Sequence, residues 1–334
     1  MNNNLEFSYN NRFSRNNKDK SYFILFKVQV ILNALIFFWY SALTKNLYLF
    51  VPIFLNLLAL YLKPSPQKII DRMNYIFQLF FQAVTIAESY HYLINVSMRL
   101  YNWNLPSSLA LMLVSMLVIY IPYVRVFFGT IESKSLQLLI SIYCFAVLSM
   151  STYGTILYFN PFVSLITNSS FLGGITFMIL IIVLMTRWGY GFPKMRLSND
   201  VNWIVLSLVL IFSLWFVLWN AFGSGNILTS FFRFNFSGIN LKPQYILSGL
   251  EAGIAEELLF RYAFLLVAFK NNSYHVFWAA IISSLCFGLL HLGNLSAGQN
   301  LASTIEQVVF AFGMGLLMCG IYLYTDLFYL PVII

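Results

Sequence analysis

The stretch Asn202–Phe222, NWIVLSLVLIFSLWFVLWNAF, contains no charged side chain. An α-helix rises 1.5 Å per residue, so about 20 apolar residues cross the hydrocarbon core of a bilayer, which is about 30 Å thick. This stretch is therefore long enough and apolar enough to be a transmembrane helix.

Similar runs occupy most of the chain. Hydrophobic residues make up 60% of the 334 positions and charged residues only 9%, whereas soluble domains contain about 25% charged residues. Length and hydropathy predict spans near 21–41, 46–62, 74–94, 108–128, 136–159, 171–186, 202–222, 245–269, 276–292 and 305–324, and the start of another near residue 328. The predicted fold is an all-α, polytopic integral membrane helix bundle with about 10–11 transmembrane helices.

Lysines, arginines and loop residues predict the topology. The Asn-rich segment 1–20 precedes a long apolar run without a small-residue cleavage site, which is typical of a cytoplasmic tail and not of a signal peptide. The segment 187–200, with two glycines and a proline, separates the N-terminal helices, 21–190, from the C-terminal helices, 191–334. The tail and the connectors on its side hold thirteen Lys and Arg, against four on the other side. This asymmetry places the N-terminus in the cytoplasm.

Charge and cysteine usage exclude some functions. The net charge is +8, but the basic residues lie in short connectors and form no stripe, so we expect no nucleic-acid partner. The three cysteines lie in apolar runs without paired spacing, which indicates neither disulfides nor a thiolate metal site. Membrane lipid is the expected surrounding, the Asn- and Ile-rich composition hints at a bacterial cell membrane, and the oligomeric state stays open.

Ionisable residues interrupt the span at 245–269, which reads EAGIAEELLFR from Glu251 to Arg261. Each such residue costs roughly 2.5–3.5 kcal/mol at the centre of a membrane helix, so it requires a function or a partner. Glu257 and Arg261 are four residues apart, the favourable order for an ion pair on one helix face. Glu256 points about 100° away from Glu257 and has no such partner. We therefore expect Glu257 to be held by Arg261 and Glu256 to be available as a general base.

The next span ends with FGLLH, from Phe287 to His291. Gly288, one turn before the histidine, permits a close approach of another helix. Glu256 and His291 lie on consecutive antiparallel spans, so they can meet at one depth in the bundle. An acid and an imidazole in one wet pocket can activate a water molecule.

Together these two motifs resemble those of the CAAX-protease and bacteriocin-processing (CPBP) family of intramembrane peptidases, E-E-x-x-x-R and then F-x-x-x-H on the next span. The matching residues are Glu256, Glu257, Arg261, Phe287 and His291. The resemblance covers residues 245–334 and includes type II CAAX prenyl endopeptidases and bacterial immunity-type members. It implies an intramembrane endopeptidase that hydrolyses a peptide or protein substrate in or beside the membrane.

The resemblance also implies residue roles. Glu256 and His291 are the expected catalytic pair that activates water, with Glu257, Arg261, Phe287 and Asn294 in support; Asn294 can equally be a helix cap. A third family motif, H-x-x-x-N or H-x-x-x-D on the following span, would stabilise the oxyanion. No histidine follows His291 in these 334 residues, so either the sequence is a fragment that ends before this motif, or it is a natural member that lacks it.

Alternative interpretations accompany this one. We expect no obligatory metal because HExxH is absent; if a divalent metal such as zinc binds, Glu256 and His291 are its expected ligands. Glu88 and His91 have E-x-x-H spacing without a second copy, which favours a structural pair over a di-iron site. The alternative function is a non-catalytic bacteriocin immunity or partner-binding membrane protein. A small transporter would require two related halves with broken helices, which the sequence does not contain.

Overall fold

The computed structural model describes residues 17–63, 68–100, 120–149, 171–223, 232–237, 242–271 and 276–334. In these residues the regular secondary structure is helical, and β-type pairing is limited to two isolated bridges. The contacts between residues divide the chain into two compact units, Met1–Gly191 and Phe192–Ile334. The predicted all-α fold class is confirmed.

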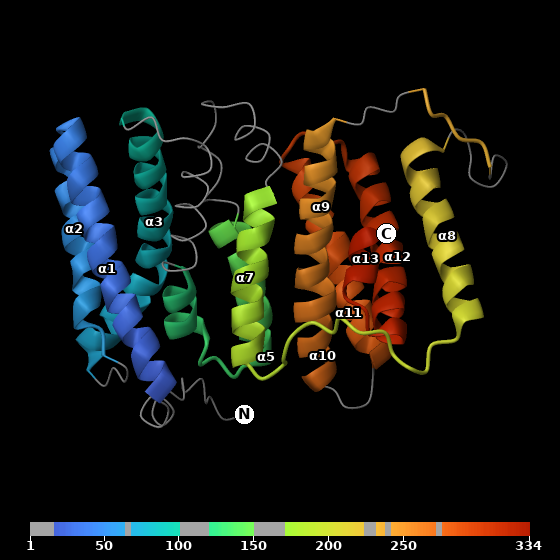
Figure 1. Cartoon of the computed structure of the whole chain (residues 1–334), viewed down its shortest axis with the longest axis horizontal. Helices are drawn as coiled ribbons and strands as arrows, with labels where there is room; N and C mark the ends of the chain where they lie inside the picture. Colours follow the sequence, from blue (N-terminus) through green and yellow to red (C-terminus); the bar gives the residue numbers. More distant parts are fainter. Residues whose placement is uncertain are drawn as a thin grey trace. The chain divides into compact units, whose positions relative to one another are not determined.

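The N-terminal unit begins with three mutually packed helices (Figure 1). They are α1 (Asn17–Thr44), α2 (Phe50–Leu57) and α3 (Ile69–Leu100), with short 3-10 segments at Leu47–Leu49 and Leu58–Tyr61. Residues 120–128 are also helical. The described part of the unit continues with α5 (Lys134–Tyr143), a π-helical turn at Cys144–Ser149, and α7 (Phe171–Arg187).

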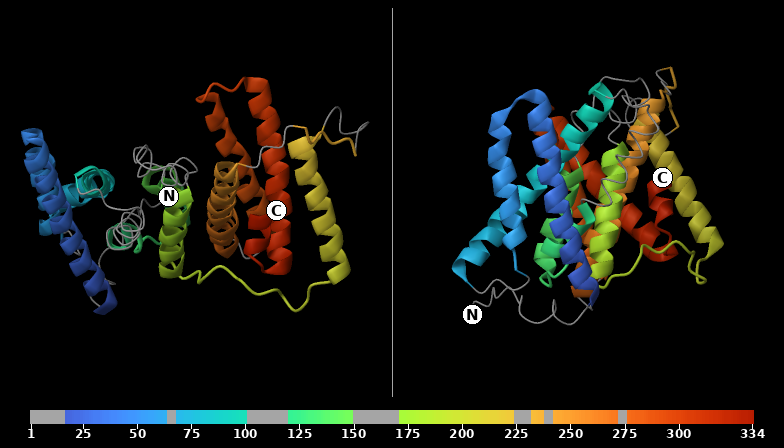
Figure 2. Two further views of the ribbon diagram at one scale, coloured as in Figure 1. Left: turned by 45° about the horizontal axis from the view of Figure 1, so that its top comes forward. Right: turned by 60° about the vertical axis from the view of Figure 1, so that its left-hand side comes forward.

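The C-terminal unit contains the helices that carry both sequence motifs. Its described α-helices are α8 (Trp203–Phe222), α9 (Pro243–Glu257), α10 (Leu265–Asn271), α11 (Val276–Leu290), α12 (Leu301–Thr325) and α13 (Tyr329–Ile333). A π-helical segment, Leu258–Phe264, joins α9 and α10 into one continuous helix, and a 3-10 segment, His291–Leu295, extends α11. Figure 2 shows α9–α10, α11 and α12 running alongside one another.

Some helices bury polar side chains and expose large apolar ones. On α1, Gln29 and Asn33 are completely buried, whereas Ile24 and Leu35 are 62% and 58% exposed. On α12, Thr304 is buried while Val309 faces outward. Large exposed apolar surfaces are tolerated where they face lipid, and polar side chains then pack between helices.

Three helices of the described chain are long and apolar enough to cross a membrane: Lys20–Thr44, Val276–Leu295 and Leu301–Thr325. Shorter apolar helices lie at Leu47–Tyr61, Lys134–Ala146, Gly173–Arg187 and Trp203–Trp219. The spans expected at 108–128 and 136–159 lie partly outside the described residues. With the outward-facing apolar side chains, these helices identify an integral membrane protein.

Small residues bring α11 and α12 into close contact. A Cβ on Gly288 would lie 2.7 Å from the carbonyl oxygen of Val308, and one on Gly315 would lie 2.9 Å from Cβ of Ser284. Glycine at these two points lets the helix backbones approach more closely than any larger residue would allow. The end of α11, where His291 lies, is therefore held against the first half of α12.

The connector before α8 is attached to the end of α12. Lys194 forms a 2.7 Å ion pair with Asp326, and Met195 pairs with Leu327 in an antiparallel bridge. The backbone N–H of Phe328 donates to the carbonyl of Lys194 at 2.9 Å. Asp326 has a positive φ of 60°, which turns the chain so that α13 runs back along α9.

Candidate active site

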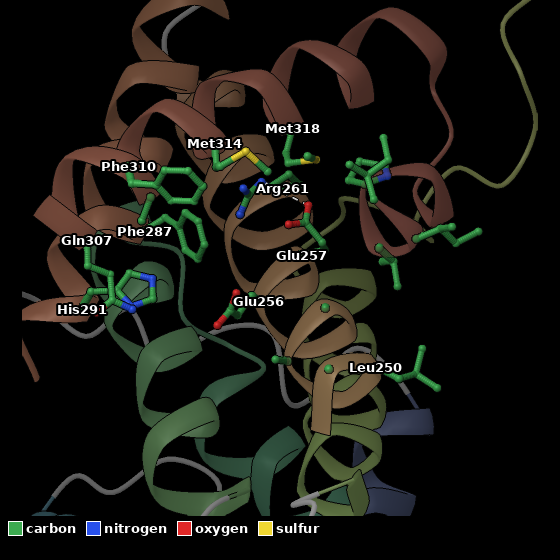
Figure 3. Close-up of a pocket in the computed structure, with 18 of the residues that line it drawn as sticks. Leu250, Glu256, Glu257, Arg261, Phe287, His291, Gln307, Phe310, Met314 and Met318 are labelled. Carbon is green, nitrogen blue, oxygen red and sulfur yellow. Dashed lines mark ion pairs between the residues drawn. The ribbon is translucent and has the colours of Figure 1, made fainter. Parts of the chain in front are cut away.

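A cavity of about 1170 Å³ lies within the C-terminal unit. Its walls come from α9 and the following π-helical segment, from the end of α11, and from α12 and α13. The cavity is lined by Glu256, Glu257, Arg261, Phe287 and His291, so five of the six residues singled out in the sequence meet in one place. Figure 3 shows their side chains around this space.

Glu257 and Arg261 form the expected pair on one helix face. Arg261 Nε lies 3.1 Å from Glu257 Oε2, and the two side chains are only 1% and 7% exposed. Despite this distance the two atoms are not aligned as a hydrogen bond. Within the described part of the chain, Nε and Nη1 of Arg261 and Oε2 of Glu257 have no hydrogen-bond partner. The pair is therefore electrostatic and keeps unused hydrogen-bonding capacity at the cavity wall.

Phe287 connects this pair to the histidine. The guanidinium carbon of Arg261 lies 4.6 Å from the centroid of the Phe287 ring, a cation–π contact. The same ring meets His291 edge-on, with centroids 5.4 Å apart, and packs on Phe260 at 5.1 Å. Because Phe287 contacts both Arg261 and His291, it fixes the position of the second motif relative to the first.

Glu256 and His291 reach the cavity from different elements. Glu256 is the second-last residue of α9, and His291 is the first residue of the 3-10 segment after α11. Both are partly exposed, and Figure 3 shows them on two sides of the cavity. A carboxylate and an imidazole that share a cavity can hold a water molecule and transfer its proton.

The π-helical segment after Glu256 is held by the neighbouring helix. Ser283 Oγ on α11 donates to the backbone carbonyl of Phe260 at 2.5 Å, and that carbonyl also accepts the N–H of Leu265, five residues later. Isolated π-helical turns inside α-helices are frequent at functional sites. Here the π-helical segment follows directly after the two glutamates and contains the arginine, and all seven of its residues are buried.

Asn294 is predicted to be either a supporting residue or a helix cap. The C-cap of the 3-10 segment is Ser296. The side chain of Asn294 instead donates from Nδ2 to Oε1 of Gln307 on α12, at 2.8 Å. Gln307 lines the cavity, so Asn294 lies one hydrogen bond behind its wall.

Sequence reasoning missed two contributions to the cavity. Gln307 was assigned no function, because a single amide in an amphipathic helix start carries no recognisable signal. The other contribution is the segment Pro331–Ile334, which also lines the cavity. The carbonyl oxygen of Val332 would lie 3.0 Å from a Cβ on Gly253, so glycine at 253 lets α13 pack directly on α9.

Much of the remaining wall is apolar, although Gln299, Ser303 and Glu306 also line the cavity. The apolar part includes Phe310, Ala311, Met314 and Met318 on α12. Figure 3 shows Phe310, Met314 and Met318 beside Phe287 and Arg261. Methionine side chains are flexible and polarisable, so they adapt to apolar groups of different shape. The cavity thus combines a polar part at Glu256 and His291 with an apolar part suited to a hydrophobic segment.

The positions of the side chains bear on whether the cavity could bind a metal ion. Among the described residues, no group of three or more His, Cys, Asp or Glu side chains is placed to hold a metal ion. Catalytic zinc sites use three protein ligands; besides the expected Glu256 and His291, the cavity is lined by Glu257, which is paired with Arg261, and by Glu306. Glu251 does not line the cavity, and the side chains of His91 and His275 lie outside the described part of the structure.

Residues 238–334 match a family model described as type II CAAX prenyl endopeptidase, Rce1-like. No curated protein and no solved structure gives a significant match to this chain. The matched segment contains both motifs and every element that lines the cavity, so the family resemblance indicated by the motifs is confirmed. The C-terminal unit of this integral membrane protein is similar to the Rce1-like type II CAAX prenyl endopeptidases.

Proposed function

We propose that this protein is an intramembrane endopeptidase that uses Glu256 and His291 to activate water for peptide-bond hydrolysis. The observation that carries the proposal is their convergence on one cavity from two helices, beside an apolar wall. The match of residues 238–334 to a prenyl endopeptidase family supports the same reaction class.

In the proposed reaction, the Glu256 carboxylate takes a proton from a water molecule that His291 holds by a hydrogen bond. The water oxygen bonds to the carbonyl carbon of the substrate peptide, and an oxyanion forms. When the carbon–nitrogen bond breaks, Glu256 returns the proton to the leaving amine. Proton transfer by a positioned side chain contributes about 10²–10⁴-fold to such rates, and no step uses a metal ion.

The proposed substrate is a peptide or protein segment that reaches the membrane with an apolar part. The apolar wall around Met314 and Met318 suits such a segment. Prenylated C-termini, bacteriocin leaders and remnant signal peptides all have this character. We also propose that the protein lies in a bacterial cell membrane, on the basis of its composition, and that its N-terminus is cytoplasmic, on the basis of the connector charges.

The test compares two Glu→Gln variants on the same helix. Glu256→Gln removes the proposed base, whereas Glu251→Gln makes the same chemical change outside the cavity. The purified chain in lipid nanodiscs is mixed with a library of quenched-fluorescent peptides that carry apolar segments. We expect Glu256→Gln to lower kcat at least about 100-fold, and Glu251→Gln, which keeps the proposed base, to lower kcat far less.

Equal turnover by Glu256→Gln and the wild type would contradict the proposed function. The non-catalytic alternative makes a different prediction for cells. If a double variant, Glu256→Ala with His291→Ala, still protects cells from a bacteriocin, partner binding is enough and hydrolysis is not required.

A further inference from the structure

Beside His291 the cavity wall contains a polar side chain that neither motif includes. Gln307 lies in the second turn of α12 and is partly exposed. It lines the cavity, and Figure 3 shows it next to the His291 ring. An uncharged amide therefore lies at the polar end of this cavity.

The local backbone explains why Gln307 lies there. A 3-10 helix has 3.0 residues per turn, so side chains three residues apart lie on the same face. In the 3-10 segment His291–Leu295, His291 is the first residue and Asn294 follows three residues later, so the two side chains share a face. Asn294 is hydrogen-bonded to Gln307, which places Gln307 alongside that face.

The helix contact at Gly288 provides the same alignment independently. The backbone of Gly288 touches Val308, because a Cβ on this glycine would lie 2.7 Å from the Val308 carbonyl oxygen. Gly288 is one turn before His291, and Val308 follows Gln307 directly. The two helices are thus in contact at the level where the histidine and the glutamine enter the cavity.

The hydrogen bond from Asn294 also selects which atoms of Gln307 are available. A glutamine amide has one oxygen acceptor and an NH₂ group with two donors. Asn294 Nδ2 donates to the oxygen of Gln307 at 2.8 Å, so the NH₂ group remains for a ligand in the cavity. The cavity therefore presents a neutral N–H donor on the His291 side, opposite the carboxylate of Glu256.

From this geometry we propose that Gln307 donates an N–H to the carbonyl oxygen of the substrate peptide, and that Asn294 is a positioning residue that orients the amide. The proposal rests on the proposed function. When water adds to the carbonyl carbon, the oxygen gains negative charge, and a donor already in place stabilises that charge. Removing one such donor lowers kcat by about 10²–10³-fold in other hydrolases.

Arg261 is a second cavity residue with unused N–H groups, but its surroundings differ. It is paired with Glu257 and stacked on Phe287. The Phe287 ring contacts Arg261 on one side and His291 on the other, so the guanidinium is separated from the imidazole by an aromatic ring. Gln307 has no such ring between it and His291 (Figure 3), which makes it the more direct neighbour of the proposed catalytic histidine.

The experiment replaces the donor without changing the size of the side chain. Gln307→Met keeps a similar length and removes both N–H groups, and Asn294→Ala releases the amide from its partner. Val309→Ala, on the outward face of α12, is the control. Each full-length variant is assayed with the best-cleaved library peptide and titrated with a peptidyl phosphonate, whose tetrahedral anion resembles the intermediate.

For Gln307→Met we expect kcat to fall by about 10²–10³-fold, with KM changed less than about threefold, and phosphonate affinity to fall with kcat. Asn294→Ala should show a smaller loss of both quantities, and Val309→Ala none. A merely structural role would lower thermal stability and raise KM without selectively weakening the phosphonate.

The outcomes separate the two proposals. If Glu256→Gln abolishes turnover but Gln307→Met keeps kcat and phosphonate affinity, Gln307 is not the donor and the proposed function stands. If Glu256→Gln keeps turnover, or if the wild type binds no phosphonate and cleaves no peptide, both proposals are wrong.

Discussion

The buried pair of Glu257 and Arg261 makes a quantitative prediction about stability. Replacing Arg261 by Met removes the cation 3.1 Å from a carboxylate that is 7% exposed, and leaves that carboxylate uncompensated. Breaking a buried ion pair in this way costs about 3–5 kcal/mol in the free energy of unfolding. The same substitution removes the cation–π contact with Phe287, which adds up to about 2 kcal/mol to the loss in the free energy of unfolding.

A double variant separates charge from packing. Arg261→Met combined with Glu257→Leu replaces both partners by apolar side chains. Such replacements are often neutral or stabilising, and here Nε and Nη1 of Arg261 and Oε2 of Glu257 have no hydrogen-bond partner among the described residues. We therefore expect the double variant to recover at least about 2 kcal/mol relative to Arg261→Met.

The measurement is SDS-induced unfolding of the purified chain in mixed micelles, followed by tryptophan fluorescence. The control is the exposed pair of Lys194 and Asp326, 64% and 36% exposed; Lys194→Met should cost less than about 1 kcal/mol. A loss below 1 kcal/mol for Arg261→Met, or a double variant no more stable than the single one, would refute the buried-pair reasoning.

Two further changes test the helix packing. Gly288→Val would push α11 away from Val308, so we expect the free energy of unfolding to fall by about 1–3 kcal/mol and the peptidase activity to fall as well. Gly313→Ala is the control, because its Cβ would meet open space, and it should be neutral or stabilising. Equal behaviour of the two variants would disprove the close contact. Asn33 is completely buried without a hydrogen-bond partner in the described part of the chain. Asn33→Leu should therefore stabilise the chain by about 1–3 kcal/mol in the same SDS titration. Destabilisation would show that Asn33 has an essential partner.

Much of the fold class could be predicted because membrane insertion depends on local composition. A run such as Asn202–Phe222 is long and apolar whatever surrounds it, and α8 occupies Trp203–Phe222. The boundaries of other helices were less predictable. The span expected to begin near 305 begins at Leu301, because Asn300 caps the helix by accepting a hydrogen bond from the N–H of Ser303.

The candidate site was predictable to the extent that its chemistry lies in short motifs. The spacing of Glu257 and Arg261 indicated their pairing, because residues four apart share a helix face. The π-helical segment between Leu258 and Phe264 had no sequence signal, since it depends on the Ser283 hydroxyl of a neighbouring helix. The same holds for the contact of Arg261 with the Phe287 ring.

The sequence by itself determined that this protein is an all-α membrane protein, because hydropathy is a local property, and its resemblance to the CPBP motifs grouped Glu256, Glu257 and His291. Only the tertiary structure decided that Gln307 lies beside His291 and that α13 returns to Gly253 to close the cavity. Both depend on how far neighbouring helices can approach. That distance is set by glycines and by single hydrogen bonds between residues that are distant along the chain.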